Sequence, residues 1–412
     1  MINLVSVKTL IQSAPVIGSA WAGFRCWQLQ HEYDQRREYY ARTTIERGLS
    51  YNEQETIAAV RKRISDRGYA PTTRKIHDIH TFAVIPQFSW HKYLLPDLQE
   101  LGPVTLFDYV ALGYSPEIFY GGPKWNSERM RLRKDMASKV LPMFRKAYRK
   151  KPVDWIFCYG GGQDISAPVI NQIVSEYRIP VINVTFDDKQ GWAGPVCGEH
   201  CTGARDLTKE IDVFFTSARV ACEWHLAQGG RAIYMPEAFD NTYFHPRACK
   251  NDIPVSFVGA SYGFRKQVIK FLQNHGVDIQ AYGTGWPRGF ANDPVDIFNR
   301  SIINLGMGGI GYSESLTNVK GRDFEIPGTG GGVYLTSFNP DLAQHFTIGE
   351  EILCYRNRDE MLELIRYYLQ HRDEAQKIAE KARIRCLQEH RWLFRYQRML
   401  EIIGVLPQKM DD

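Results

Sequence analysis

The sequence predicts an α/β protein with two domains and a helical N-terminal extension. Its 412 residues exceed the roughly 100–200 of one domain. Apolar runs of strand length alternate with amphipathic helical segments, an order that predicts parallel sheets. The alternation pauses near residues 235–240 and then starts again. We therefore expect an extension (1–78), two domains (79–240 and 241–390), and a C-terminal helix (391–412) that crosses back to the first domain.

The extension is predicted from helical spacing. Ile57, Val60 and Ile64 recur on one helical face, and the segment ends at Gly68-Tyr-Ala-Pro71. Near its start, residues 9–24 carry no charge, but the run is too short for a bilayer and contains Gln12 and Pro15. We interpret this run as a docking helix or a peripheral membrane contact.

The strands of both domains are near-continuous apolar runs, as expected when helices cover both faces of a sheet. In the first domain the predicted strands are 80–88, 103–109, 153–162, 179–188 and 210–217, with helices at 91–102 and 167–177. In the second they are 253–260, 277–283, 301–307, 331–337 and 350–356, with helices at 263–276, 318–328 and from 359 to 403.

Composition favours an ordinary globular protein, because 44% of the residues are hydrophobic and 24% are charged. The net charge of +5 is concentrated in residues 129–151, which hold ten basic residues and one acid. This stretch either attracts an anionic membrane or acidic acceptor, or is the solvated face of an amphipathic helix whose apolar stripe includes Met136, Val140 and Phe144. No base-reading motif accompanies the charge, so we expect no nucleic-acid partner.

The eight cysteines lack the paired spacing of a disulfide framework, which favours a reducing compartment. Cys197-Gly-Glu-His-Cys201 is the one cluster, and no second pair of ligands completes a zinc site. We expect no metal.

Several ordered motifs carry a family resemblance. They are VSFVGASYGFRKQVIKFLQNHGVDIQAYGTGW (255–286), NVKGRDFEIPGTGGGVYLTSFNPDL (318–342) and F-x-x-G-x-E-I-x-x-Y (346–355), with weaker matches at IPVINVTFDD and YMPEAFDNTYFHP. With these motifs the chain resembles the CgeB-like branch of the group 1 glycosyltransferases, named for a spore maturation protein.

The resemblance implies the GT-B fold, in which two Rossmann-like domains face each other across a cleft. It also implies a UDP- or GDP-linked sugar as donor, a hydroxyl acceptor on a glycan or surface polysaccharide intermediate, a retaining mechanism, and no cofactor. Because such donors are cytosolic, we expect a cytoplasmic enzyme, with a peripheral place at the membrane as an option.

The turn after strand 253–260 is a candidate diphosphate site. Gly259 and Ser261 are small enough for phosphate to approach the backbone, and Arg265 follows at the start of a helix with free N–H groups. Alternatively, the glycines only form a tight turn.

Gly283-Thr-Gly285-Trp286 follows the next strand. A complete Gly-x-Gly-x-x-Gly is absent, which argues against a nicotinamide-dependent oxidoreductase. The resemblance places this loop near the nucleotide base, with Trp286 as a wall or stacking surface; alternatively Trp286 is a packing residue.

The segment 320–332 combines cations, a carboxylate and glycines. Lys320 and Arg322 are suited to neutralise a leaving diphosphate, and Glu325 to accept hydrogen bonds from ribose hydroxyls. Backbone N–H groups of Thr329, Gly330 and Gly331 are suited to hold phosphate or sugar oxygens. Alternatively, the charged residues form a surface ion network.

One departure from the wider family concerns a glutamate eight residues before the ribose-binding one. That position is Thr317, with Glu314 and Ser315 nearby. The incomplete motif leaves open a non-catalytic nucleotide-sugar-binding or scaffold protein.

The acceptor side is expected at the ends of first-domain strands, where open α/β sheets bind ligands. Asp187 and Asp188 are candidates to orient the acceptor hydroxyl or act as base, or else cap the strand end. Gly160, Gly161 and Asp164 lie on a neighbouring loop. The catalytic residues we select are Asp187, Asp188, Arg265 and Lys320.

Overall fold

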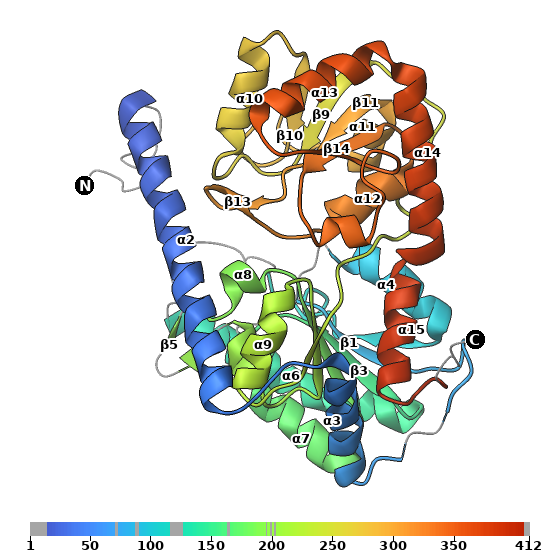
Figure 1. Ribbon diagram of the computed structural model, residues 1–412. Coiled ribbons are helices and arrows are strands. Elements are labelled where there is room, and N and C mark those ends of the chain that lie inside the picture. The colour runs from blue at the N-terminus through green and yellow to red at the C-terminus, as the bar shows by residue number, and fades with distance from the viewer. Residues whose placement is uncertain are drawn as a thin grey trace. The chain divides into compact units, whose positions relative to one another are not determined.

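The computed structural model describes residues 15–70, 73–86, 90–115, 127–162, 165–194, 196–197, 200–201 and 203–407. The chain divides into two compact units (Figure 1). Unit one comprises Met1–Glu38 and Tyr243–Glu389, and unit two comprises Tyr39–Thr242 and His390–Asp412. The N-terminal 78 residues thus do not form a unit of their own.

Unit two contains a six-stranded parallel sheet in the order β2-β1-β3-β4-β7-β8. The strands are β1 (Thr81–Val84), β2 (Val104–Leu106), β3 (Trp155–Tyr159), β4 (Val181–Thr185), β7 (Val213–Thr216) and β8 (Ala232–Tyr234). The predicted strands of this region are present, and β8 is an additional strand. β1, β3, β4 and β7 are fully buried, as their continuous apolar sequences require.

The helices of unit two surround this sheet. They are α3 (Glu53–Asp66), α4 (His91–Leu101), α6 (Ser127–Lys150), α7 (Ala167–Tyr177), α8 (Asp188–Gly191), α9 (Arg219–Ala227) and α15 (Trp392–Ile402), with a 3₁₀ turn at Ala204–Leu207. A small antiparallel pair, β5 (Val196–Cys197) and β6 (His200–Cys201), lies outside the sheet.

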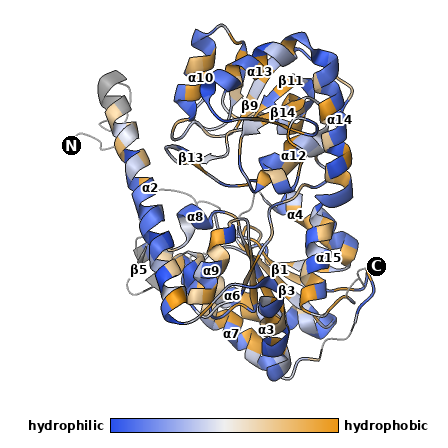
Figure 2. Cartoon of the chain, viewed as in Figure 1, coloured by the Kyte–Doolittle hydropathy of each residue, from blue (hydrophilic) through white to orange (hydrophobic). Residues whose placement is uncertain are grey.

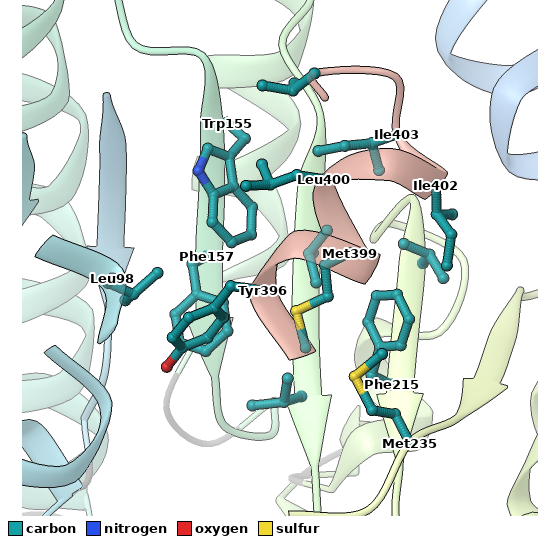
Figure 3. Close-up of a cluster of buried hydrophobic side chains, with 14 of the residues drawn as sticks. Leu98, Trp155, Phe157, Phe215, Met235, Tyr396, Met399, Leu400, Ile402 and Ile403 are labelled. Carbon is teal, nitrogen blue, oxygen red and sulfur yellow. The ribbon is translucent and has the colours of Figure 1, made fainter. Parts of the chain in front are cut away.

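Helix α15 comes from the end of the chain and completes the core of unit two. Figure 3 shows Tyr396, Met399 and Leu400 among Trp155, Phe157 and Phe215. The rings of Phe157 and Tyr396 lie 5.4 Å apart in an edge arrangement. Asp97 of α4 is buried beside α15 and accepts hydrogen bonds from Leu393 N and Arg391. Burial raises the pKa of Asp97 to about 6. Arg391 acts in the opposite direction, because its hydrogen bond and positive charge stabilise the ionised carboxylate.

Helix α6 carries the basic stretch. Met136, Val140, Phe144 and Ala147 are buried on one face, while Lys134, Lys139, Lys146 and Lys150 are exposed. The helix is therefore amphipathic, with the cations on its solvated face.

Unit one contains a five-stranded parallel sheet in the order β10-β9-β11-β14-β15. The strands are β9 (Ile253–Val258), β10 (Ile279–Tyr282), β11 (Ser301–Leu305), β14 (Val333–Ser337) and β15 (Leu353–Tyr355). The helices are α10 (Arg265–Asn274), α11 (Pro294–Arg300), α12 (Arg322–Thr329), α13 (Arg358–Gln370) and α14 (Arg372–Glu389), with a 3₁₀ turn at Leu342–Gln344. In Figure 2, α10 and α14 carry both hydrophilic and hydrophobic residues, as helices that cover a sheet do.

A hairpin of β12 (Gly309–Ile310) and β13 (Ser313–Thr317) also belongs to unit one and was not predicted from the sequence. Two parallel sheets, each with its own helices and hydrophobic core, confirm the predicted α/β fold class with two Rossmann-like domains.

Helix α2 (Pro15–Glu46) begins in unit one and ends in unit two. In unit two its Tyr40 is buried between Trp192 and Trp224, with ring centroids 5.8 Å from each, and accepts a hydrogen bond from Trp192 Nε1. Of the helices in the described ranges, none combines the length and hydropathy needed to cross a membrane.

Candidate active site

The first part of the site is the turn between β9 and α10. Gly259 N donates to Tyr282 O (2.8 Å), and Ser261 N donates to Thr284 O (2.9 Å). A Cβ on Gly285 would overlap Ser261 Oγ, so this loop and the one after β10 lie in direct contact. Gly263 has a φ of 66°, and a Cβ there would overlap the carbonyl of Gly311 in the β12–β13 turn. Gly259, Ser261, Gly283 and Gly285 are thus brought together, at the carboxyl ends of β9 and β10.

Trp286 closes one side of these loops. Its indole Nε1 donates to Gly259 O (2.7 Å), and its ring lies edge-on to Phe257 at 6.1 Å. The residue is half-buried, so it has a packing role in the turn and keeps part of its surface exposed.

Arg265 is the first residue of α10, and its side chain is mostly buried, with 8% of the residue exposed. Its Nη1 donates to Ala260 O (3.0 Å), and the guanidinium lies 4.3 Å from the centre of the Tyr262 ring. Its Nε is buried without a hydrogen-bond partner, and among the described residues no carboxylate forms an ion pair with it. Burial, with a further contribution from the charge of Arg322, lowers the pKa of Arg265.

The second part of the site is the start of α12. Lys320 Nζ donates to Gly309 O (3.0 Å), which ties the lysine to the β12–β13 hairpin. Arg322 forms an ion pair with Glu325 three residues later; the Arg322 side chain is 35% exposed and that of Glu325 is 6% exposed. The ion pair that the sequence offered as an alternative is therefore present, on a buried carboxylate.

Asp323 belongs to this group and was missed in the sequence analysis. It is buried, accepts a hydrogen bond from Tyr334 OH (2.6 Å), and accepts another from Lys320 N (2.7 Å). Burial raises the pKa of Asp323 to about 6. The sequence contains a signal that could have identified Asp323, namely an acid three residues after Lys320. A side chain at this spacing can accept a hydrogen bond from a free backbone N–H at the start of a helix.

The glycine run lies at the opposite end of α12. Gly330 ends the helix with a φ of 71°, and Thr329 is fully buried. A Cβ on Gly331 would overlap the backbone of Asn299, and Arg383 donates to Gly328 O. These residues pack against α11 and α14, about 12 Å along the helix from Lys320. The structure thus does not bring Thr329, Gly330 and Gly331 together with the cations, and their glycines serve the turn into β14.

Thr317, at the position of the first family glutamate, lies on β13 opposite Gly309. The nearby Glu314 forms an ion pair with Arg358 of α13.

In unit two, the adjacent aspartates differ sharply. Asp188 is 2% exposed, and its Oδ2 accepts hydrogen bonds from the hydroxyls of Thr185 and Thr216, both at 2.6 Å. Asp187 is exposed at the start of α8. Asp188 therefore joins the ends of β4 and β7, and Asp187 is the carboxylate open to solvent.

The neighbouring loop after β3 is partly described. Gly160 O accepts a hydrogen bond from Asn183 Nδ2 (2.9 Å), and Gly161 is half-buried. Asp164 lies outside the described residues. Gly160 and the aspartates are brought together by adjacent strands β3 and β4.

Among the residues that the structure describes, no group of three or more His, Cys, Asp or Glu is arranged to hold a metal ion. The side chains of Cys197 and Cys201 are not among those described.

Comparison with known proteins bears on this site directly. A family model described as glycosyl transferase-like matches residues 265–401, a range that contains Arg265, Lys320, Arg322 and Glu325. A search of the curated proteins gives no significant match.

Solved structures resemble the chain in fold at low sequence identity. The trehalose 6-phosphate synthase of Burkholderia multivorans has a TM-score of 0.50 and 11% identity, covering 80% of this chain and 99% of its own. The sucrose-phosphate synthase of Thermosynechococcus elongatus has a TM-score of 0.49 and 11% identity, covering 79% and 98%. The Anabaena protein HepE, in complex with UDP-glucose, has a TM-score of 0.48 and 10% identity, covering 80% and 100%.

Residues 265–401, which contain the cationic residues of the site, are thus similar to glycosyl transferase-like domains, and the fold is that of GT-B glycosyltransferases.

Proposed function

We propose that this glycosyltransferase moves a sugar from a UDP- or GDP-linked donor to a hydroxyl acceptor, and that unit one binds the donor. The environment of Arg265 supports this proposal. A buried guanidinium without a carboxylate partner is costly, and a second cation, Arg322, acts on it electrostatically. An anion bound at this point offsets both costs.

The diphosphate of the donor is the anion that fits these groups. The first N–H groups of α10, Arg265, Lys320 and Arg322 all offer donors or positive charge near the carboxyl ends of β9, β11 and β14. Glu325 then binds the ribose: its ion pair with Arg322 fixes the carboxylate and leaves acceptor capacity for ribose hydroxyls. The loop from Gly283 to Trp286 borders the nucleotide base.

The chemistry that follows is stabilisation of a leaving group. As the bond from the sugar to the diphosphate breaks, negative charge grows on the diphosphate oxygens, and cations already in place stabilise it without reorganisation. Lys320 and Arg265 are the catalytic residues in this scheme. With positive charge supplied by side chains, we propose that the reaction requires no metal and no cofactor, and that configuration is retained.

For the acceptor we propose a glycan or a surface polysaccharide intermediate. Asp187 is the candidate to orient the acceptor hydroxyl, because it is open to solvent. Asp188 supports it through Thr185 and Thr216. We also propose that the chain belongs to the CgeB-like branch and that the enzyme is cytoplasmic. The basic helix α6 is proposed to attract anionic membranes.

A non-catalytic nucleotide-sugar-binding protein is the second candidate, favoured by Thr317 in place of the first family glutamate. Slow hydrolysis of the donor without acceptor distinguishes the two, because a transferase active site cleaves its donor and a binding protein does not.

The test is titration calorimetry with UDP and GDP in EDTA, on the wild type and on Arg265→Met. We expect one nucleotide to bind wild type, and the variant to lose about ten- to a hundredfold in affinity. Without nucleotide the variant should be as stable as wild type or more stable, because it removes an unpaired buried charge.

The control is Arg372→Gln, an exposed arginine at the start of α14, which should leave nucleotide affinity unchanged. If neither nucleotide binds wild type at millimolar concentration, the donor assignment is wrong. If Arg265→Met instead binds normally but unfolds at a lower temperature, Arg265 has a structural role.

A further inference from the structure

We propose that the exposed side of α2 within unit one, formed by Phe24, Trp27 and His31, docks on the surface of an anionic lipid bilayer. We call these residues the aromatic ridge. The inference does not depend on the donor site, and it concerns a different element from the basic helix α6.

The first half of α2 has one face turned to unit one. Ala22 and Cys26 line a cavity together with Phe264, Gln267 and Tyr312. Further along, a Cβ on Gly311 would lie 3.0 Å from Leu29 Cδ2. Positions 22, 26 and 29 share a helical face, so this is the side by which α2 packs on its own unit.

The aromatic ridge lies on another face of the helix. Phe24 is 53% exposed and Trp27 is 59% exposed, and His31 is exposed as well. Ring centroids of Phe24 and Trp27 are 6.0 Å apart, and Trp27 stacks on His31 at 5.1 Å. In the described part of the chain these rings thus contact one another along α2 and leave the remainder of their surface to solvent. Adjacent exposed aromatic rings of this kind mark an interaction surface.

Charge indicates which surface they meet. Lys8 and Arg25 are the charged side chains before Glu32, the first acid in the sequence. The exposed Arg25 donates to Gln28 Oε1 (2.6 Å), a neutral acceptor, so its charge is not neutralised by this bond. Glu32 lies at the end of this segment and accepts a hydrogen bond from Gln28 (2.8 Å), so the excess of positive charge that attracts anionic headgroups belongs to the residues before it.

The residue types point the same way. Tryptophan favours the membrane interface, where its ring is buried among acyl chains and headgroups and its N–H keeps a polar partner. The residues immediately before the ridge, 9–23, carry no charge, so the apolar character continues toward the N-terminus. A helix with exposed aromatic residues on one side, preceded by a segment whose charged residues are basic as far as Glu32, is suited to lie in the plane of an anionic interface.

The experiment is flotation with vesicles of phosphatidylcholine alone or with phosphatidylglycerol, using the full chain. We expect wild type to float with the anionic vesicles, and Phe24→Ser/Trp27→Ser to lose about tenfold in partitioning for each ring removed. Phe290→Ser is the matched control, because Phe290 is a 76% exposed aromatic residue of the same unit, in the loop between β10 and α11. It should float like wild type.

Further arms separate this proposal from the others. At high salt the α6 variant Lys146→Gln/Lys150→Gln should float to the same extent as wild type. Salt screens the attraction between lysines and anionic headgroups, but it does not weaken the insertion of aromatic rings. Nucleotide-induced stabilisation of the double ridge variant should equal that of wild type, which shows that the fold and the donor site are intact.

Two outcomes would overturn the proposal. One is flotation of the ridge variant equal to that of wild type. The other is a wild-type dimer in light scattering that the ridge substitutions convert to monomer, without vesicle binding by either; the ridge would then be a contact between two copies of the chain.

Discussion

Glu325 illustrates how one side chain combines a local ion pair with a candidate binding role. Its carboxylate is almost inaccessible, while its partner Arg322 is one third exposed. The pair joins a half-buried arginine to a buried carboxylate, so its attraction is partly offset by the cost of removing that carboxylate from water. Ribose recognition, which needs a carboxylate held in place, is the role we propose for Glu325 in addition to that pair.

Replacement of Glu325 by Gln should lower nucleoside-diphosphate affinity by about ten- to a hundredfold, because lost charge-assisted hydrogen bonds cost roughly 1.5–3 kcal/mol. Thermal stability should change little, since Gln preserves the shape of the side chain. Calorimetric titration of both proteins measures the difference. Glu351→Gln is the matched control, because Glu351 is also a largely buried acid paired with an arginine, Arg385. If the affinity of Glu325→Gln for nucleotide is unchanged, Glu325 does not bind ribose, and its role is limited to the ion pair with Arg322.

The residues of the site could be predicted in part. Arg265 at a helix start and the group from Lys320 to Glu325 were found because charge and glycine spacing suggest phosphate chemistry. Sequence does not tell which way a carboxylate turns. Asp323 and Asp188 look like surface acids in a polar segment, yet each is buried and bound by hydroxyl groups. The roles of all the predicted site residues remain predictions.

At the scale of elements, the turn into α10 depends on close backbone approach. Gly263 combines a left-handed φ of 66° with direct contact to the β12–β13 turn at Gly311. Lys320 is tied to the same hairpin through Gly309 O. The hairpin thus joins the first and second parts of the site within unit one.

Gly263→Ala should destabilise unit one by about 1–3 kcal/mol and weaken nucleotide binding, because the added methyl group must displace the hairpin that holds Lys320. Gly276→Ala is the control. Gly276 has a similar φ of 79°, but open space surrounds its Cβ position, so it reports the backbone cost without the clash. Thermal melts with and without nucleotide measure both effects. Equal losses of stability and affinity in the two variants would show that the hairpin contact is unimportant.

The strands illustrate what apolar periodicity can and cannot predict. β3, β4 and β9 appear in the sequence as near-continuous apolar runs because helices cover both faces of their sheets. β8 has three residues, and the hairpin strand β12 has two. Runs this short have no recognisable period of their own, and the equally short β2 and β15 were predicted only because they lie within longer segments, 103–109 and 350–356, that were assigned as strands. The run of glycines after α12 allows two interpretations from sequence, since a helix C-terminus and a phosphate loop both favour glycine, and its role at the donor remains a prediction.

Neither unit of the molecule is formed by one continuous stretch of the chain. Unit one is assembled from an N-terminal and a central segment, and unit two from a central and a C-terminal segment. Each unit has its own hydrophobic core. In unit two that core includes Tyr396, Met399 and Leu400 of α15 (Figure 3), and α15 follows α14 of unit one along the chain.

This arrangement predicts that a core substitution in the last helix weakens unit two and leaves unit one unchanged. Leu400 of α15 is fully buried, so Leu400→Ala should cost unit two about 2–5 kcal/mol. Leu335→Ala, a fully buried leucine of β14, should have the same cost in unit one. Because proteins of more than one domain need not unfold in a single step, scanning calorimetry can resolve the two transitions.

Nucleotide identifies which transition belongs to which unit. A ligand that binds only the folded form of unit one stabilises that unit by about 2.7 kcal/mol at a hundred times its Kd. The transition that moves with UDP or GDP should therefore be lowered by Leu335→Ala and untouched by Leu400→Ala. If Leu400→Ala instead lowers the nucleotide-sensitive transition by the same amount as Leu335→Ala, the two units unfold as one cooperative block. The stability of the donor site in unit one then depends on α15, a helix of the core of unit two.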